Sequence, residues 1–193
     1  LADATDLAFV QISAIFTDEP KYFGQLPWTP GIFADFETSF GYDLRPRLGD
    51  LFSEDLCSRA VLTRLHYRQW CGQRFAAAWL KPVADWCRSH QLQLVGHISP
   101  EDDLVQQSSC ITNRFPLFEH FDLPGIDLII PAVGDHHHPM INVGVISAVS
   151  AQQQLNKPGV MSESLACSGL EMAALEAQRI LLWQTMMGVT TPV

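Results

Sequence analysis

The stretch LAFVQISAIFT, residues 7–17, is almost entirely apolar and rich in β-branched residues, and it stops at Asp18-Glu19-Pro20. A short apolar run that ends at charged residues and proline predicts a strand buried on both faces. Strands of this kind are typical of parallel sheets covered by helices. The stretch therefore directs the fold prediction toward an α/β protein.

Further strands and helices alternate along the rest of the chain. Short apolar segments predict strands over residues 92–96, 126–130, 159–162 and 188–192. Apolar spacing predicts helices over residues 32–40, 112–121, 141–155 and 170–187, and one or two helices over residues 58–89 with a break or kink near Pro82. This alternation is the pattern of a parallel sheet with right-handed crossovers.

Two parallel architectures fit this pattern. A closed (β/α)8 TIM barrel needs about 250 residues, so a chain of 193 residues with five predicted strands fits part of a barrel. A doubly wound sheet fits the length equally well, but it usually binds a nucleotide through a glycine-rich first turn. Neither GxGxxG nor GxxxxGK[ST] follows any predicted strand, which weakens that alternative.

Composition and charge exclude several classes of partner. The chain is 47% hydrophobic and 17% charged, which predicts a globular protein. Its formal net charge of -9 repels phosphate backbones and anionic lipid surfaces, so we expect neither nucleic acid nor a membrane surface as a partner. No apolar run approaches the roughly 20 residues that cross a bilayer.

Three predicted strand ends carry a glutamate: Glu19, Glu101 and Glu163. Functional residues of parallel α/β folds collect at the carboxyl ends of strands. Two carboxylates facing each other across a cleft can hydrolyse a glycosidic bond, one protonating the leaving oxygen and the other activating water or attacking. Alternatives remain for each: Glu19 could belong to a helix cap or a solvated loop, and the sequence 101–103 could start a helix or bind calcium. For Glu163, spacing alone fits a functional and a structural role equally well, although the small residues around it leave room for a ligand.

A histidine-rich segment, Asp135-His136-His137-His138, raises the alternative of a zinc-dependent hydrolase. Adjacent residues of an extended segment point to opposite faces, so all three histidines do not easily converge on one ion. His97 could supply a further ligand; otherwise it is a polar pocket residue or a satisfied core histidine.

Aromatic residues offer two further interpretations. Tyr22, Phe23 and Trp28 lie in the long loop after the first strand, where exposed rings could stack on sugars. The helical spacing of the other tryptophans predicts that they are buried; these are Trp70, Trp79, Trp86 and Trp183.

Several motifs occur in a fixed order. They are FTDEP (16–20), PWT (27–29), FxxxFGYDLRPRLGDLF (36–52), DWC (85–87), GH (96–97), KPGVMSES (157–164) and GV (188–189). With these motifs the chain resembles, from residue 16 to residue 189, the barrel domain of bacterial α-L-rhamnosidases of glycoside hydrolase family 106 and their uncharacterised relatives.

The resemblance implies that residues 1–193 form one partial catalytic domain, about strands 4–8 of a (β/α)8 barrel, within a longer chain that also carries accessory β-domains. It implies an inverting α-L-rhamnosidase acting on terminal rhamnose of poly- or oligosaccharides. A periplasmic or secreted location is expected for such a substrate. A non-catalytic carbohydrate-binding barrel remains the alternative from another class.

The resemblance also implies roles for individual residues. Glu19 would be the general acid and Glu163 the general base, while Glu101 and His97 would bind substrate or a calcium ion, with Glu101 as its ligand. The remaining expected substrate-binding residues are Asp18, Trp28, His137 and Ser162. The acid must stay protonated, which burial or the neighbouring charge of Asp18 could achieve for Glu19.

Overall fold

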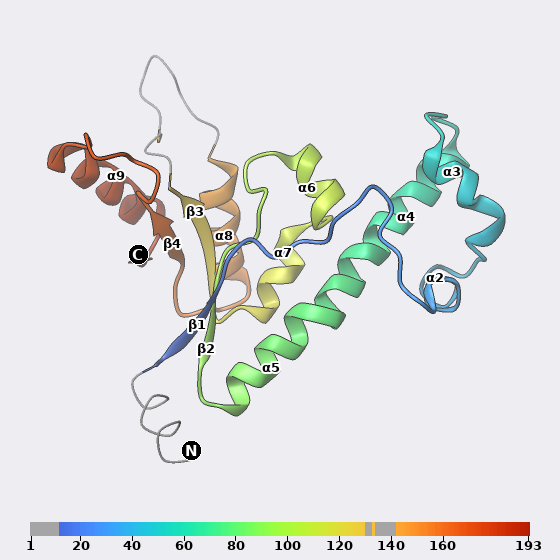
Figure 1. Cartoon of the computed structure of the whole chain (residues 1–193), viewed down its shortest axis with the longest axis horizontal. Helices are drawn as coiled ribbons and strands as arrows, with labels where there is room; N and C mark the ends of the chain where they lie inside the picture. The colour runs from blue at the N-terminus through green and yellow to red at the C-terminus, as the bar shows by residue number, and fades with distance from the viewer. Residues whose placement is uncertain (1–11, 130–132, 134–141) are drawn as a thin grey trace.

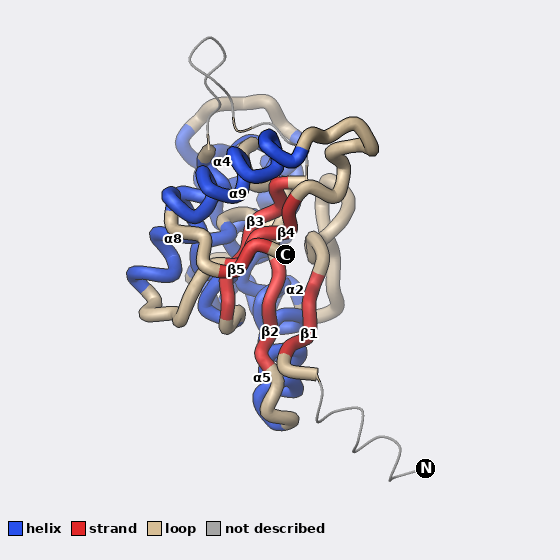
Figure 2. The backbone as a smooth tube through the Cα atoms, turned by 90° about the vertical axis from the view of Figure 1, so that its left-hand side faces the viewer, coloured by secondary structure: helices blue, strands red, loops and turns tan. Residues whose placement is uncertain are grey.

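Five parallel strands form one sheet in the computed structural model, which describes residues 12–129, 133 and 142–193. The strands are β1 (Ala14–Thr17), β2 (Gln93–Gly96), β3 (Leu123–Leu128), β4 (Met161–Ser164) and β5 (Thr191–Pro192). Each lies beside its predecessor in the chain, in the order β1-β2-β3-β4-β5 (Figure 2). A doubly wound sheet reverses its order partway, so this topology excludes that alternative and is compatible with part of a barrel.

Glycines allow the central strands to approach closely. Gly96 ends β2 with a φ of 137°, and a Cβ there would stand 2.1 Å from the carbonyl oxygen of Thr17. A Cβ on Gly125 would stand 2.4 Å from the carbonyl oxygen of Gly96. The Pro124-Gly125 pair therefore lies inside β3, although such a pair usually marks a turn, and β3 begins earlier than predicted, at Leu123.

Along the chain, helices come between successive strands, as the alternating pattern predicts (Figure 1). They are α2 (Ile32–Phe40), α3 (Leu48–Phe52), α4 (Ser58–Phe75), α5 (Lys81–Ser89), α6 (Leu104–Cys110), α7 (Arg114–Leu117), α8 (Val143–Gln154) and α9 (Ala174–Met187), with short 3-10 turns at Arg45–Arg47 and Phe118–His120. The helices α3 and α6 were not predicted. Asp103 starts α6, because its side chain accepts hydrogen bonds from the backbone amides of Val105 and Gln106.

The irregularity predicted near Pro82 is a π-helical turn and not a break of the helix. The helices α4 and α5 continue one another through a π-helical turn, Ala76–Leu80, and form one long rod (Figure 1). Pro82 comes directly after this turn, in the first turn of α5. A proline is tolerated there because its missing N–H has least effect at the start of a helical segment.

Two groups of buried apolar side chains make up the core of the described residues. One lies between the sheet and the helices α5, α7 and α8 and includes Leu94, Phe118 and Ile126; the other joins α2 to α4. Trp70 is buried in the second group, but Trp79 and Trp86 are exposed to 38% and 45%, so the prediction of burial is wrong for these two. Their ring faces pack along their own helix instead, Trp79 on Phe75 and Trp86 on His90.

One face of the sheet is only partly covered by the described residues. Ile15 and Leu94 point into the core, whereas Phe16, on the other face of β1, is 45% exposed. Within the described residues, β1 and β5 each pair with one neighbouring strand. Both observations are compatible with a sheet that continues into further strands. No helix in the described part of the chain is both long enough and apolar enough to cross a bilayer.

Candidate active site

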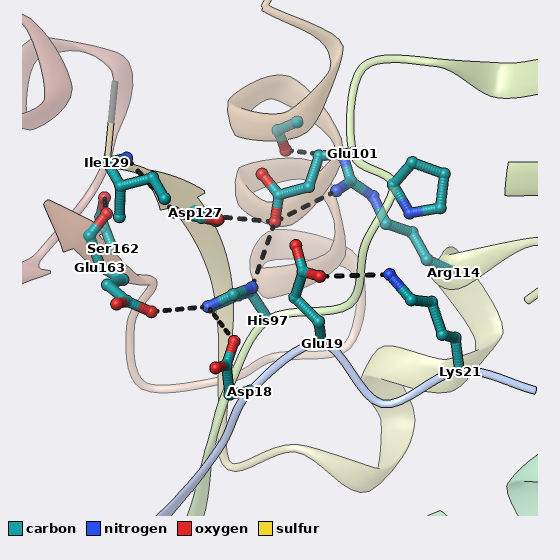
Figure 3. A network of polar contacts seen from close by, with 12 residues as sticks. Asp18, Glu19, Lys21, His97, Glu101, Arg114, Asp127, Ile129, Ser162 and Glu163 are labelled. Carbon is teal, nitrogen blue, oxygen red and sulfur yellow. Dashed lines mark hydrogen bonds and ion pairs between the residues drawn. The ribbon is translucent and has the colours of Figure 1, made fainter. Parts of the chain in front are cut away.

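Acidic side chains gather around one histidine at the carboxyl ends of β1 to β4 (Figure 3). Asp18 and Glu19 follow β1, His97 and Glu101 follow β2, Asp127 lies in β3, and Glu163 lies in β4. The register pairs Thr17 with Gly96 and Asp127 with Glu163, which brings these strand ends to one edge. We call Asp18, Glu19, Glu101, Asp127 and Glu163 the acidic cluster.

His97 lies at the centre of the acidic cluster and is fully buried. Its Nε2 is 2.9 Å from Glu163 Oε2, a hydrogen bond, and 3.6 Å from Asp18 Oδ1. Its Nδ1 faces Glu101 Oε1 at 4.0 Å and has no hydrogen-bond partner. The imidazole therefore separates Glu101 on one side from Glu163 and Asp18 on the other.

Glu19 has a left-handed backbone conformation, with a φ of 45°, and forms an ion pair of 3.1 Å with Lys21 Nζ. Partial burial raises its pKa, but hydrogen bonds from Ser99 and Lys21 and the charge of Lys21 outweigh this effect, so the pKa is lowered overall. Burial alone would favour the protonated form that the general acid needs, but the hydrogen bonds from Ser99 and Lys21 favour the ionised form of Glu19.

Glu101 faces protein groups rather than solvent, and its side chain is 10% exposed. Its Oε1 accepts a hydrogen bond of 3.0 Å from the Asp127 backbone amide and lies 3.7 Å from Arg114 Nη1. Burial raises the pKa of Glu101 to about 8, although Arg114 and the Asp127 amide act in the opposite direction. The structure thus places Glu101 behind His97, among buried partners.

Three residues of this region were not singled out from the sequence: Lys21, Arg114 and Asp127. Burial raises the pKa of Asp127, and the nearby carboxylates of Glu163 and Glu19 add to the effect, while His97 opposes it. A signal for Asp127 was present, because it is the one acidic residue in the apolar segment IDLII. Lys21 and Arg114 carry no comparable local signal.

The structure does not bring every predicted site residue to the acidic cluster. Ser162 is fully buried next to Glu163, and its hydroxyl donates to the backbone oxygen of Glu163 at 3.3 Å. Trp28 is 60% exposed, packs edge-on against Phe33 at 5.1 Å, and lies beside α2 and α4. The residues Asp135, His136, His137 and His138 lie outside the described part of the chain.

Two sets of side chains within the described residues have the spacing of metal ligands. They are Asp18, His97 and Glu163, and Glu19, His97 and Asp127, with potential ligand atoms within 4.8 Å of one another in each set. Both sets include an imidazole nitrogen, whereas calcium takes oxygen ligands. Glu101, the expected calcium ligand, belongs to neither set, so these donors do not fit the calcium site that the sequence predicts.

The chemistry open to this site follows from its charge. Glu19 and Glu163 are part-exposed carboxylates adjacent to His97, with side chains 37% and 34% exposed. Groups of this kind can donate a proton to a leaving oxygen and activate a water molecule. The surrounding negative charge would stabilise a transition state that develops positive charge, as an oxocarbenium-like sugar does.

Comparisons with known proteins give one line of support. No protein-family model matches the chain, and no curated protein matches its sequence. A solved rhamnosidase from Novosphingobium sp. PP1Y is similar in structure, with a TM-score of 0.73 and 20% sequence identity over 94% of this chain. The chain spans 17% of the length of that protein. At this identity the likeness concerns the fold alone: the chain folds like a stretch of that rhamnosidase.

Proposed function

We propose that this chain is part of the catalytic (β/α)8 barrel of an α-L-rhamnosidase-like glycoside hydrolase that removes terminal rhamnose from oligo- or polysaccharides. The main support is that Glu19 and Glu163 both lie next to His97, because glycoside hydrolysis uses a pair of accessible carboxyl groups. The sequential parallel strand order and the fold likeness to a rhamnosidase support the barrel. The remainder of the barrel and the accessory β-domains would come from the rest of a longer chain.

In the proposed reaction, one glutamate protonates the glycosidic oxygen and the other removes a proton from the attacking water. Inversion requires the two carboxyl groups to stand about 6.5 to 9.5 Å apart, which leaves space for that water. The sequence resemblance favours Glu19 as the acid and Glu163 as the base. The lowered pKa of Glu19 favours the opposite assignment, since an ionised carboxylate beside Lys21 is ready to act as a base.

The test uses the full-length protein and a 4-nitrophenyl α-L-rhamnoside beside a rhamnose-containing oligosaccharide. We expect Glu19→Gln and Glu163→Gln each to lower kcat on the oligosaccharide by about 100-fold or more. The variant lacking the acid should keep most of its activity on the nitrophenyl substrate, whose leaving group needs no proton. The variant lacking the base should regain turnover when azide is added as a nucleophile.

Glu54→Gln is the matched control, because Glu54 is an exposed glutamate near α3, outside the acidic cluster. It should leave kcat unchanged on both substrates. Normal turnover in both Glu19→Gln and Glu163→Gln would refute the catalytic pair. Sugar binding by a wild-type protein without turnover would favour the non-catalytic carbohydrate-binding barrel instead.

A metal-dependent hydrolase is the second candidate, favoured by the two sets of ligand-like side chains that share His97. The expected readout is metal content: stoichiometric zinc in the purified full-length protein, lost together with activity on chelation, would support it. Loss of calcium with activity would support the calcium prediction. The glycosidase proposal keeps a periplasmic or secreted location as its expectation, to be checked by cell fractionation.

A further inference from the structure

We propose that Glu101 and Arg114 are positioning residues that hold His97 in the orientation in which its Nε2 binds Glu163. The inference rests on the proposed function, because it concerns how the glutamate of that site is held. Neither residue contacts Glu163 directly, since His97 lies between Glu101 and Glu163 (Figure 3).

The first observation is the convergence of buried polar atoms on one carboxylate oxygen. His97 Nδ1 lies 4.0 Å and Arg114 Nη1 3.7 Å from Glu101 Oε1, and both nitrogens are buried without a hydrogen-bond partner. Buried nitrogens without a partner destabilise the folded state, so both have a driving force to approach Glu101. A shift of about 1 Å would bring either pair to hydrogen-bond distance, and contacts of catalytic groups often shorten in this way when substrate binds.

The second observation is that Glu101 is fixed from the opposite direction. Its Oε1 already accepts the Asp127 backbone amide at 3.0 Å, which ties it to β3. Gly144 leaves the space that the side chain occupies, because a Cβ at position 144 would stand 3.0 Å from Glu101 Oε2. The backbone at the start of α8 is therefore shaped around this carboxylate.

The third observation is the anchoring of Arg114, which is 1% exposed. Its Nη2 donates to the backbone oxygens of Val143 and Gly144, at 3.2 and 3.0 Å, and to the Ser147 hydroxyl. Nη1 is left to face Glu101. The guanidinium thus connects the first turn of α8 to Glu101, and Glu101 faces the ring of His97.

The consequence for the site is a chain of side chains from α8 to β4: Arg114, Glu101, His97 and Glu163. Only Glu163, at its end, is accessible enough to meet a substrate. If the His97 ring is held on its Nδ1 side, the ring has one orientation, and in it Nε2 faces Glu163. Groups that orient a reacting residue from behind in this way typically change activity by about 10- to 100-fold when removed, as measured for partners of metal ligands.

The test compares Glu101→Ala, Glu101→Asp and Glu101→Gln in the full-length protein with the nitrophenyl and oligosaccharide rhamnosides. We expect Glu101→Ala to lower kcat by about 10- to 100-fold with a smaller change in KM. Glu101→Asp keeps the carboxyl group but withdraws it from His97, so it should lose activity as well. Glu101→Gln keeps an oxygen in place of Oε1 and should restore kcat to within a few-fold of wild type.

Asp102→Ala is the matched control from the same loop. Asp102 accepts the backbone amide of Gly144 at 2.7 Å, so its loss loosens the same contact with α8 without removing a contact to His97. It should lower the melting temperature and leave kcat unchanged. Adding Glu101→Ala to His97→Ala should cause no further loss of kcat, because Glu101 acts through His97.

Two outcomes would overturn the proposal: equal kcat in Glu101→Ala and Asp102→Ala, or losses from Glu101→Ala and His97→Ala that multiply. A crystal structure of Glu101→Asp supplies a readout independent of activity. A His97 ring still 2.9 Å from Glu163 in that variant would refute positioning, whereas a rotated ring would support it. If the wild-type protein hydrolyses no rhamnoside, the proposed function fails, and the crystal structure of Glu101→Asp still decides whether Glu101 positions His97.

Discussion

Replacing Glu101 by glutamine is expected to remove a large pH dependence of stability. The folded-state pKa of Glu101 is about 8, against an ordinary value of 4.5, because burial outweighs the favourable charge of Arg114. The difference of about 3.5 pKa units corresponds to about 5 kcal/mol. Between pH 4.5 and pH 8 the folded state holds a proton that the unfolded state has released, so wild-type stability falls as pH rises and levels off above pH 8.

Glutamine has no proton to release, so this contribution is absent from Glu101→Gln. The full-length chain is unfolded with denaturant at pH 5 and at pH 9, and hydrogen exchange of peptides from β2 and β3 reports the unfolding of this part of the protein. From pH 5 to pH 9, the free energy of unfolding of the variant should rise by about 4 kcal/mol relative to that of the wild type. Exposed Glu54→Gln serves as the control. Parallel pH curves for wild type and Glu101→Gln would refute the reasoning.

Three further substitutions, with Gly49→Ala as a control, test the fold. Gly96→Ala should prevent native folding, because its Cβ would stand 2.1 Å from the Thr17 carbonyl oxygen at a φ of 137°. Gly49→Ala in α3 should be tolerated, because a Cβ there would have no atom within 4 Å. Soluble yield and circular dichroism of the two variants check this difference. Arg114→Met should cost about 1–3 kcal/mol or more in denaturant unfolding, because it leaves the buried backbone oxygens of Val143 and Gly144 without their donor. An unchanged midpoint would contradict this. Asp103→Ala should speed hydrogen exchange at the start of α6, where the amides of residues 105 and 106 lose their cap.

Much of the fold could be predicted from local sequence patterns. The parallel α/β class and the positions of β2, β4, α2, α8 and α9 follow from apolar runs and helical spacing. A buried strand or helix face needs apolar residues at a regular spacing, and this pattern is visible within about ten residues of sequence. Glu163 could be proposed for the same reason, since it directly follows a buried apolar segment. The helix irregularity near Pro82 also has a local signal, although its form, a π-helical turn, does not. The Pro124-Gly125 pair lies inside β3 because the chain there approaches β2 closely, and the local pattern misjudged this pair.

The candidate site divides in the same way. The sequence by itself placed Asp18, Glu19, His97, Glu101 and Glu163 at strand ends, because the alternation of strand and helix brings those ends to one edge of a parallel sheet. Only the tertiary structure decided what each group does there. Hydrogen bonds from Ser99 and Lys21 lower the pKa of Glu19, whereas burial raises the pKa of Glu101 to about 8 and sets its side chain behind His97. Charge states and contacts of this kind depend on desolvation and on partners far apart in the chain, and neither is encoded in the spacing of residues along the sequence.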